Sequence, residues 1–216
     1  MTTKAYKVQE IFYSLVGEGA QVGRPAVFVR FHGCNLWNGD ESMRRRAACN
    51  FCDTDFISMT GTFSGEYDSS ALADMVSKIW LDQQTTRPLA GRYVVLTGGE
   101  PALQVDEALI AQLHQHGFSV AIETNGTRSL PHGIDWVCVS PKGTASLKIQ
   151  AGQELKLVFP QEGVDPDKFS NLAFGHFFIQ PKDAPGKNHW SEAKEYCLKN
   201  SFWKLSLQMH KVLGLR

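Results

Sequence analysis

Residues 93–101 read YVVLTGGEP, a short apolar run rich in β-branched residues that ends in glycines, an acid and a proline. This composition predicts a strand that is buried on both faces, as strands of parallel sheets are. The glycines and the proline end the strand and place Glu100 in the turn that follows it. The stretch therefore predicts an α/β fold in which unusual residues gather at the carboxyl end of a strand.

Similar runs recur along the chain, and most of them also end in glycine, proline or polar residues. They are PAVFVRF (25–31), SVAIET (119–124), DWVCVS (135–140), ELKLVF (154–159) and HFFIQ (176–180). Amphipathic stretches over 69–84 and 106–116 lie between some of them, and Asp106 is placed as a helix N-cap. Alternating strands and helices favour a parallel sheet. About six strands, where a complete barrel has eight, predict an open, partial (β/α)6-type TIM barrel whose functional side is the carboxyl edge of the strands.

The composition is typical of a globular domain. The chain has 216 residues, 43% of them hydrophobic and 20% charged, which predicts a single domain over 1–216. Its 22 basic and 22 acidic residues give a net charge of zero, which disfavours direct binding to nucleic acid. The apolar runs are too short to cross a bilayer and the first residues lack a secretory pattern, so we expect no membrane segment and a cytoplasmic location.

Three of the five cysteines lie close together, at positions 34, 49 and 52. Cys49 and Cys52 form a local pincer, and Cys34, just past the end of a predicted strand, can fold back over it as a third thiolate. Three thiolates would leave one iron of a [4Fe-4S] cube open to a small molecule. Zinc would need a fourth ligand, for which His32 is the nearest candidate. The cysteines by themselves leave both metals open.

The segment between the first two of these cysteines is long, because fourteen residues (35–48) separate Cys34 from Cys49. It is polar and charged, as an excursion into solvent would be, and closing the longer loop costs only about 1 kcal/mol. We interpret its basic run, Arg44–Arg46, as a solvated loop. We interpret the remaining cysteines, Cys138 and Cys197, as packing residues.

Together, the cysteines and TGGEP (97–101) resemble the radical S-adenosylmethionine (SAM) superfamily. In that superfamily three cysteines follow the first strand of a partial α/β barrel, an aromatic residue precedes the last cysteine, as Phe51 does here, and a GGE-type element ends the second strand. The chain departs from the usual C-x3-C-x2-C spacing through its longer insertion. The resemblance implies a [4Fe-4S] cluster and SAM as cofactors.

Further segments narrow the resemblance to the 7-carboxy-7-deazaguanine synthase family of the queuosine precursor pathway. They are SLVGEGAQVGRPAVFVRFHGCNLW (14–37), CDTDF (52–56), ETNGT (123–127), SPK (140–142), IQP (179–181) and LQMHK (207–211). Val16 stands where a glutamine is common in this family. The resemblance implies a radical SAM carbon–nitrogen lyase that converts 6-carboxy-5,6,7,8-tetrahydropterin to 7-carboxy-7-deazaguanine and ammonia by ring contraction, with SAM used catalytically.

The resemblance also implies metal ligands. The cluster is expected on Cys34, Cys49 and Cys52, at the ends of the enlarged cluster-binding loop over 35–48. The hydroxyl of Thr54 is the expected protein ligand of Mg²⁺, with the substrate carboxylate and waters completing the octahedron. Without the family, Thr54 could as well cap a helix.

The remaining candidate residues are assigned to SAM or to the pterin. The residues expected at SAM are Phe51, Gly98, Gly99, Glu100, Thr124, Asn125, Ser140 and Lys142. The backbone of the GGE element is expected to receive the methionine amino group, because only glycine lets a backbone approach a ligand so closely. The residues expected at the pterin are Leu15, Gly17, Glu18, Arg30, Gln180 and His210. Glu18 is expected to accept from the guanidine-like edge and Arg30 to bind the carboxylate.

Each assignment has an alternative without function. Glu18 could be a solvated loop acid, His210 a terminal surface histidine, Lys142 half of a surface ion pair and Phe51 a core residue. The family suggests a homodimer and an electron donor of the flavodoxin or ferredoxin type. Rival readings are another small radical SAM enzyme, such as a glycyl-radical activating enzyme, and a zinc-stabilised binding module. The tail that contains His210 and the long cysteine loop argue against the first, and iron and sulfide in the protein would exclude the second.

Overall fold

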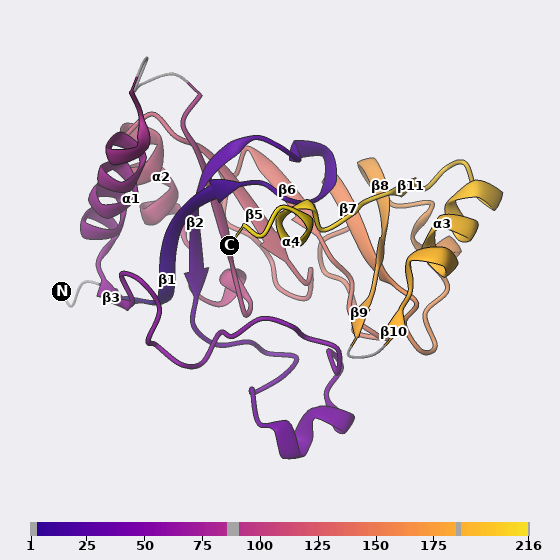
Figure 1. The fold of residues 1–216 in the computed structure, drawn as a ribbon. Coiled ribbons are helices and arrows are strands. Elements are labelled where there is room, and N and C mark those ends of the chain that lie inside the picture. Colours follow the sequence, from indigo (N-terminus) through magenta and orange to yellow (C-terminus); the bar gives the residue numbers. More distant parts are fainter. Residues whose placement is uncertain (1–3, 86–90, 185–186, 216) are drawn as a thin grey trace.

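One mixed sheet of nine strands organises the computed structural model, which describes residues 4–85, 91–184 and 187–215 (Figure 1). The strand order is β11-β8-β7-β6-β5-β4-β2-β1-β3. The strands are β1 (Tyr6–Leu15), β2 (Pro25–Phe31), β3 (Gly65–Tyr67), β4 (Tyr93–Gly98), β5 (Ser119–Thr124), β6 (Trp136–Val139), β7 (Ala151–Phe159), β8 (Ala173–Pro181) and β11 (Lys204–Leu205), with β9 (Asp183–Ala184) and β10 (Lys187–Asn188) forming a separate pair. The α-helices are α1 (Ser69–Gln83), α2 (Glu107–Gln115), α3 (Trp190–Lys199) and α4 (Met209–Val212).

The predicted strands form the parallel centre of this sheet. Parallel pairing runs without interruption from β2 through β4, β5, β6 and β7 to β8. The predicted α/β class is therefore confirmed. The regular alternation of strands and helices holds only in the first half, where α1 and α2 fill the crossovers. The connection from β7 to β8 carries only a short 3-10 turn, Pro166–Phe169.

Strand β1 was not predicted, and it lies antiparallel to β2. Its sequence mixes polar residues into an apolar run, because its inner face lines a cavity while its outer face is core. A bulge between Val8 and Glu10 shifts the register, so that the neighbours Gln9 and Glu10 both line that cavity. Because polar residues occupy its inward positions, this strand does not contain the continuous hydrophobic run by which the other strands are predicted.

The sheet curls until its two ends approach each other. Six strand spacings separate β1 from β8 in the sheet order, which would be about 29 Å in a flat sheet. Nevertheless Gln180 on β8 donates a hydrogen bond of 3.1 Å to Glu18, which follows β1 by three residues. This curvature agrees with the open partial barrel that the strand count predicts.

Helices bury the outer face of the sheet and leave its inner face to the cavity. Leu72, Val76 and Trp80 of α1, together with Leu109 and Leu113 of α2, lie in one apolar cluster with the outer side chains of β1, β2, β4 and β5. Helix α3 covers the other end of the sheet, as Figure 1 shows in orange and yellow. Among the described helices, none combines the length and apolar character needed to span a bilayer.

Asp106 caps α2 as the sequence predicts. Its Oδ1 accepts hydrogen bonds from the Leu109 amide at 3.1 Å and from the Tyr6 hydroxyl at 2.6 Å, while Oδ2 pairs with Lys4. One side chain therefore joins the start of α2 to the edge of the sheet.

We expect Asp106→Ala to lower the free energy of unfolding by about 1–2 kcal/mol, because the helix loses its cap and Tyr6 loses its acceptor. Denaturant unfolding measures the change. Asp106→Asn retains a capping oxygen and serves as the matched control, with a smaller expected loss. Equal losses in the two variants would contradict the capping argument.

Candidate active site

A cavity of about 520 Å³ opens at the carboxyl ends of the parallel strands. It brings together every predicted site residue except Glu100. Those that line it are Leu15, Gly17, Glu18, Arg30, Cys34, Cys49, Phe51, Cys52, Thr54, Gly98, Gly99, Thr124, Asn125, Ser140, Lys142, Gln180 and His210. Residues from both ends of the chain thus line the same cavity.

The long loop between Cys34 and Cys49 brings all three clustered cysteines to the same cavity. Cys34 follows β2, while Cys49 and Cys52 follow a 3-10 helix, η2 (Glu41–Arg46). The hydrogen bond from the Cys49 thiol lowers the pKa of Cys52 to about 6, whereas burial raises the pKa of Cys34. A low pKa favours the thiolate, which is the form that binds metals.

Within 4–85, 91–184 and 187–215, no group of three or more His, Cys, Asp or Glu side chains is gathered as a single metal ion requires. His32, the candidate fourth zinc ligand, is not among the residues that line the cavity, and its buried Nδ1 has no hydrogen-bond partner among these residues. Zinc and an iron–sulfur cluster on the three cysteines both stay predictions.

The glycines of the TGGEP turn are required by the protein's own backbone. Gly98 has φ of +128°, and a Cβ at this position would lie 2.4 Å from the Phe31 backbone. A Cβ at Gly99 would lie 2.0 Å from the carbonyl oxygen of Gly33, the residue before Cys34. The glycines therefore let the end of β4 pack against the end of β2, beside a cluster cysteine. Sequence reasoning had attributed them to the approach of SAM.

Glu100 lies behind the cavity wall, with no exposed surface. Its carboxylate accepts hydrogen bonds from the Thr124 hydroxyl at 2.6 Å and from the Asn125 amide at 2.7 Å. Burial raises the pKa of Glu100, and these hydrogen bonds partly counteract the rise. The side chain joins the ends of β4 and β5, so a contact with SAM from this position would come from the backbone, as expected.

Asn125 is also tied to the start of the cluster loop. Its Nδ2 donates to Asn35 at 3.0 Å, Asn35 donates to the Thr127 hydroxyl at 2.8 Å, and Thr127 donates back to Asn125 at 2.6 Å. This closed ring holds the end of β5 next to the residue that follows Cys34. Neither Asn35 nor Thr127 was singled out in the sequence.

Another part of the cavity lining carries Ser140 and Lys142, which follow β6, and Phe51, which lies between Cys49 and Cys52. Lys142 donates to the Ser140 hydroxyl at 2.6 Å, and its Nζ lies 5.7 Å from the centre of the Phe51 ring. Phe51 and Lys142 are therefore neighbours in the cavity lining. Phe51 is only partly buried and does not belong to the core.

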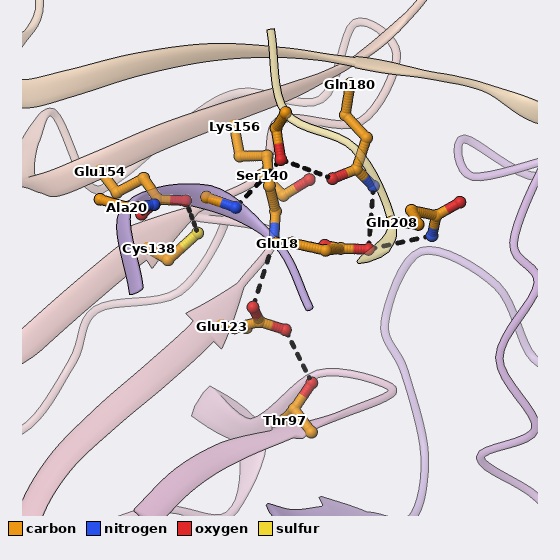
Figure 2. Close-up of polar contacts among 12 residues, drawn as sticks. Glu18, Ala20, Thr97, Glu123, Cys138, Ser140, Glu154, Lys156, Gln180 and Gln208 are labelled. Carbon is orange, nitrogen blue, oxygen red and sulfur yellow. Dashed lines mark hydrogen bonds and ion pairs between the residues drawn. The ribbon is translucent and has the colours of Figure 1, made fainter. Parts of the chain in front are cut away.

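A buried ammonium group forms the centre of a group of charged and polar side chains at the cavity, as Figure 2 shows. Lys156 Nζ on β7 lies 2.5 Å from Glu18 Oε2 and 3.1 Å from Glu123 Oε1, and its side chain is 5% exposed. Burial alone would raise the pKa of Glu18, but the charge and hydrogen bond of Lys156 lower it to about 2. Burial would lower the pKa of Lys156, yet the two carboxylates raise it well above its ordinary value. Glu18 and Lys156 therefore stay ionised around neutral pH.

Sequence reasoning missed Lys156 and Glu123, although a signal for Lys156 exists. A lysine within the apolar run 154–159 must find a partner if that strand is buried on both faces. Cys138 is buried, as a packing residue should be, and its thiol lies 3.5 Å from Glu154 Oε1, although it also reaches the cavity. Cys197 packs at the edge of an apolar cluster, as predicted.

Arg30 already has a partner inside the protein. Its Nε donates to Glu10 Oε1 at 2.7 Å across the β1–β2 pair, and its side chain is 21% exposed. A substrate carboxylate would therefore meet an arginine that Glu10 has already oriented. Glu10 was not predicted, because it lies in β1, the strand that lacks a continuous hydrophobic run.

Thr54 lines the cavity beside two acids. Its hydroxyl lies 3.5 Å from Asp53 Oδ1, and Asp55 accepts from the Ile57 amide at 3.0 Å. No helix begins at these residues, and the next one along the chain starts at Ser69. The alternative that Thr54 caps a helix is therefore wrong.

The C-terminal segment closes one side of the cavity. Gln208 donates to Glu18 at 2.9 Å, and the Met209 amide donates to the Gly17 carbonyl at 2.8 Å. The ring of His210 lies so close to Gly17 that a Cβ there would be 2.2 Å from Nδ1. Lys211 bridges Asp53 and Asp183, at 2.6 Å from each. His210 is thus a cavity residue, and the last residue, Arg216, lies outside the described residues.

Comparisons with known proteins agree on one group of relatives. No protein-family model matches the chain. The 7-carboxy-7-deazaguanine synthase of Bordetella pertussis is 54% identical over 213 residues, which cover 98% of this chain and 99% of the relative. The protein of the same name from Bradyrhizobium diazoefficiens is 51% identical over 214 residues, covering 98% and 100%. The crystal structure of QueE from Escherichia coli covers 95% of both chains with a TM-score of 0.70 at 26% identity.

Removing the buried ammonium should destabilise the protein in a pH-dependent way. We expect Lys156→Met to lower the free energy of unfolding by about 3 kcal/mol at pH 8, because it leaves Glu18 and Glu123 without their counterion. In the wild type, the lowered pKa of Glu18 contributes stability above the pKa of about 4.3 in the unfolded chain, and this is lost only as pH falls toward 2.

In the variant, burial without Lys156 raises the pKa of Glu18, so protonation relieves the unpaired charge. The deficit relative to the wild type should therefore shrink between pH 8 and pH 5, as measured by denaturant unfolding. Lys148→Met, at an exposed lysine, is the control and should change little at either pH. A deficit that does not vary with pH would refute the role of Lys156 as a counterion.

Proposed function

The chain belongs to the 7-carboxy-7-deazaguanine synthase family, and from this premise we propose that it converts 6-carboxy-5,6,7,8-tetrahydropterin to 7-carboxy-7-deazaguanine and ammonia. One observation carries the proposal: the three clustered cysteines, the two glycines of the GGE turn and the polar residues expected at the pterin line the same cavity. When bound, a [4Fe-4S] cluster and SAM supply the radical that removes and returns a substrate hydrogen. The protein binds and orients the reactants and excludes water.

The cofactor end of the cavity would hold the cluster through Cys34, Cys49 and Cys52. The donor set supports this, since the Cys49–Cys52 pair favours one thiolate at neutral pH. SAM would lie between the GGE turn and the wall that carries Phe51 and Lys142, with Thr124, Asn125 and Ser140 at its polar groups. The tight packing of Gly99 on Gly33 supports this arrangement, because it holds the GGE turn at a fixed position beside Cys34.

The substrate end would receive the pterin with its guanidine-like edge toward Glu18. This carboxylate is ionised and already accepts from Lys156, Gln180 and Gln208. An ionised carboxylate has about four acceptor positions, so the pterin would take the remaining one and displace a glutamine amide to gain another. Leu15 and Gly17 would contribute the wall beside it. Gln180 then has two roles, orienting Glu18 and yielding its place to substrate.

The carboxylate of the substrate would meet Arg30 and a Mg²⁺ ion. Glu10 holds the Nε side of Arg30, which leaves the terminal nitrogens to bind a carboxylate in the plane of the guanidinium. Mg²⁺ would take the Thr54 hydroxyl, substrate oxygen and waters, with the charge of Asp53 nearby. His210, held against Gly17, would close the cavity over the bound pterin.

We further propose that the whole chain, 1–216, is one radical SAM core domain with an enlarged cluster-binding loop over 35–48. It would act as a homodimer in the cytoplasm, with a flavodoxin or ferredoxin-type protein as electron donor. The identity of the relatives favours the synthase over a glycyl-radical activating enzyme.

The reaction can be tested directly under anaerobic conditions. Protein reconstituted with iron and sulfide should form 7-carboxy-7-deazaguanine, detected by mass spectrometry, when reductant, SAM, Mg²⁺ and 6-carboxytetrahydropterin are all present. Omission of SAM or reductant should abolish the product, and omission of Mg²⁺ should reduce it. Cleavage of SAM to 5′-deoxyadenosine without any deazaguanine would retain the radical chemistry and reject the substrate.

The cysteine at the start of the long loop provides a second test. Cys34→Ala should lose most of the iron that the reconstituted wild type holds, together with activity, because only two thiolates remain for the cluster. Cys197→Ala removes a half-buried thiol on α3 and is the matched control, with wild-type iron content expected. Full iron in Cys34→Ala would remove this residue from the ligand set.

A further inference from the structure

The enlarged cluster loop has little apolar surface to hold it in place. Figure 1 shows the segment that carries η2 extending away from the sheet. Within 35–48, all of which the structure describes, Trp37 is the only buried residue, and η2 buries none. A loop of this kind needs another source of order if it is to return Cys49 and Cys52 to a defined position.

Arg44 contacts the beginning and the middle of this loop and the residues that follow its end. Its guanidinium lies 4.0 Å from the centre of the Trp37 ring. Two hydrogen bonds of 2.6 Å join it to Glu41 in a bidentate pair. Its NH1 donates to the carbonyl of Cys52 at 2.9 Å and to that of Asn50 at 3.3 Å.

These contacts connect the cluster cysteines to the core. Trp37 packs edge-on against Phe56 at 5.5 Å, and Phe56 is 1% exposed. The stacked guanidinium therefore rests on a ring that the core anchors, while its NH1 holds the backbone on both sides of Phe51. Glu41 fixes the plane of the guanidinium, because a bidentate pair allows one orientation.

The charge of Arg44 also lies near a cluster cysteine. Because NH1 donates to the carbonyl of Cys52 itself, the positive charge of the guanidinium lies beside that cysteine. Arg45 and Arg46 are exposed, so the interpretation of the basic run as a solvated loop holds for them and is wrong for Arg44.

We propose that Arg44 is the positioning residue for the Cys49 and Cys52 ligands, which it holds in place through the carbonyls of Asn50 and Cys52 while its fixed positive charge lies beside the cluster. The inference rests on the proposed function, since it assumes a cluster on these cysteines. In this way one arginine provides the order that a shorter cysteine spacing would provide through a tight turn.

The first test uses the metal-free protein. Hydrogen exchange of the backbone amides over 49–53 should be roughly tenfold faster in Arg44→Gln than in the wild type, because charge-assisted hydrogen bonds that hold this turn are lost. Arg44→Lys should also exchange faster, since an ammonium lacks the planar fork. Arg45→Gln is the matched control at the next, exposed position and should behave as the wild type.

The second test uses the reconstituted protein and separates positioning from simple stability. In Arg44→Gln the cluster should have a more negative reduction potential and an altered electron paramagnetic resonance spectrum when reduced, because a nearby cation favours the reduced, more negative cluster. Arg44→Lys keeps the charge and should restore much of the potential while its loop still exchanges rapidly. Circular dichroism checks that each variant is folded.

Wild-type exchange in Arg44→Gln would overturn the inference, and so would faster exchange with an unchanged potential and spectrum. Failure of the proposed function is distinguishable, because the wild type itself would then bind no iron–sulfur cluster. In that case the exchange measurement on metal-free protein still decides whether Arg44 orders the turn. If Arg44→Gln fails to fold, Arg44→Lys carries the exchange test, and wild-type exchange in that variant would overturn the inference.

Discussion

The buried ammonium of Lys156 is the interaction on which the geometry of the cavity depends. It joins Glu18, beyond β1, to Glu123 at the end of β5, and so connects elements that a flat sheet would keep apart. Burying a charge is costly unless it is paired, and here the buried cation is paired with two carboxylates, of which Glu123 is 33% exposed. The result is a cavity wall with an excess negative charge, which suits a ligand that presents hydrogen-bond donors.

A second set of contacts, made by close packing and hydrogen bonds, fixes another part of the cavity. Gly99 packs directly on Gly33, and Glu100 joins the ends of β4 and β5 from behind the wall. The segment with the strongest sequence signal therefore serves first to hold strand ends at a fixed separation. A cofactor that binds there would meet a preformed surface, so the protein would lose less conformational entropy on binding.

The cysteine loop shows how a long insertion can be compatible with a defined site. Lengthening a loop costs little free energy, but it does not position the ligands at its ends. In this chain Trp37 anchors the loop to the core, and Arg44 transmits that position to the backbone around Phe51. The C-terminal segment acts similarly on the other side, where Gln208 and Lys211 attach it to the cavity.

The sequence by itself determined the α/β class, the parallel strands, the cap at Asp106 and the residue types at the carboxyl edge, because these depend on local periodicity and on residues adjacent in the chain. The resemblance supplied the candidate ligands, and all but Glu100 line one cavity. Only the tertiary structure revealed β1, whose inward polar residues break the apolar pattern, and the pairs that Lys156, Glu10 and Arg44 form. Such pairs depend on which side chains the curled sheet and the cysteine loop bring within hydrogen-bond distance. The positions of Glu18 and Lys156 in the sequence do not indicate that the two residues are neighbours in the fold.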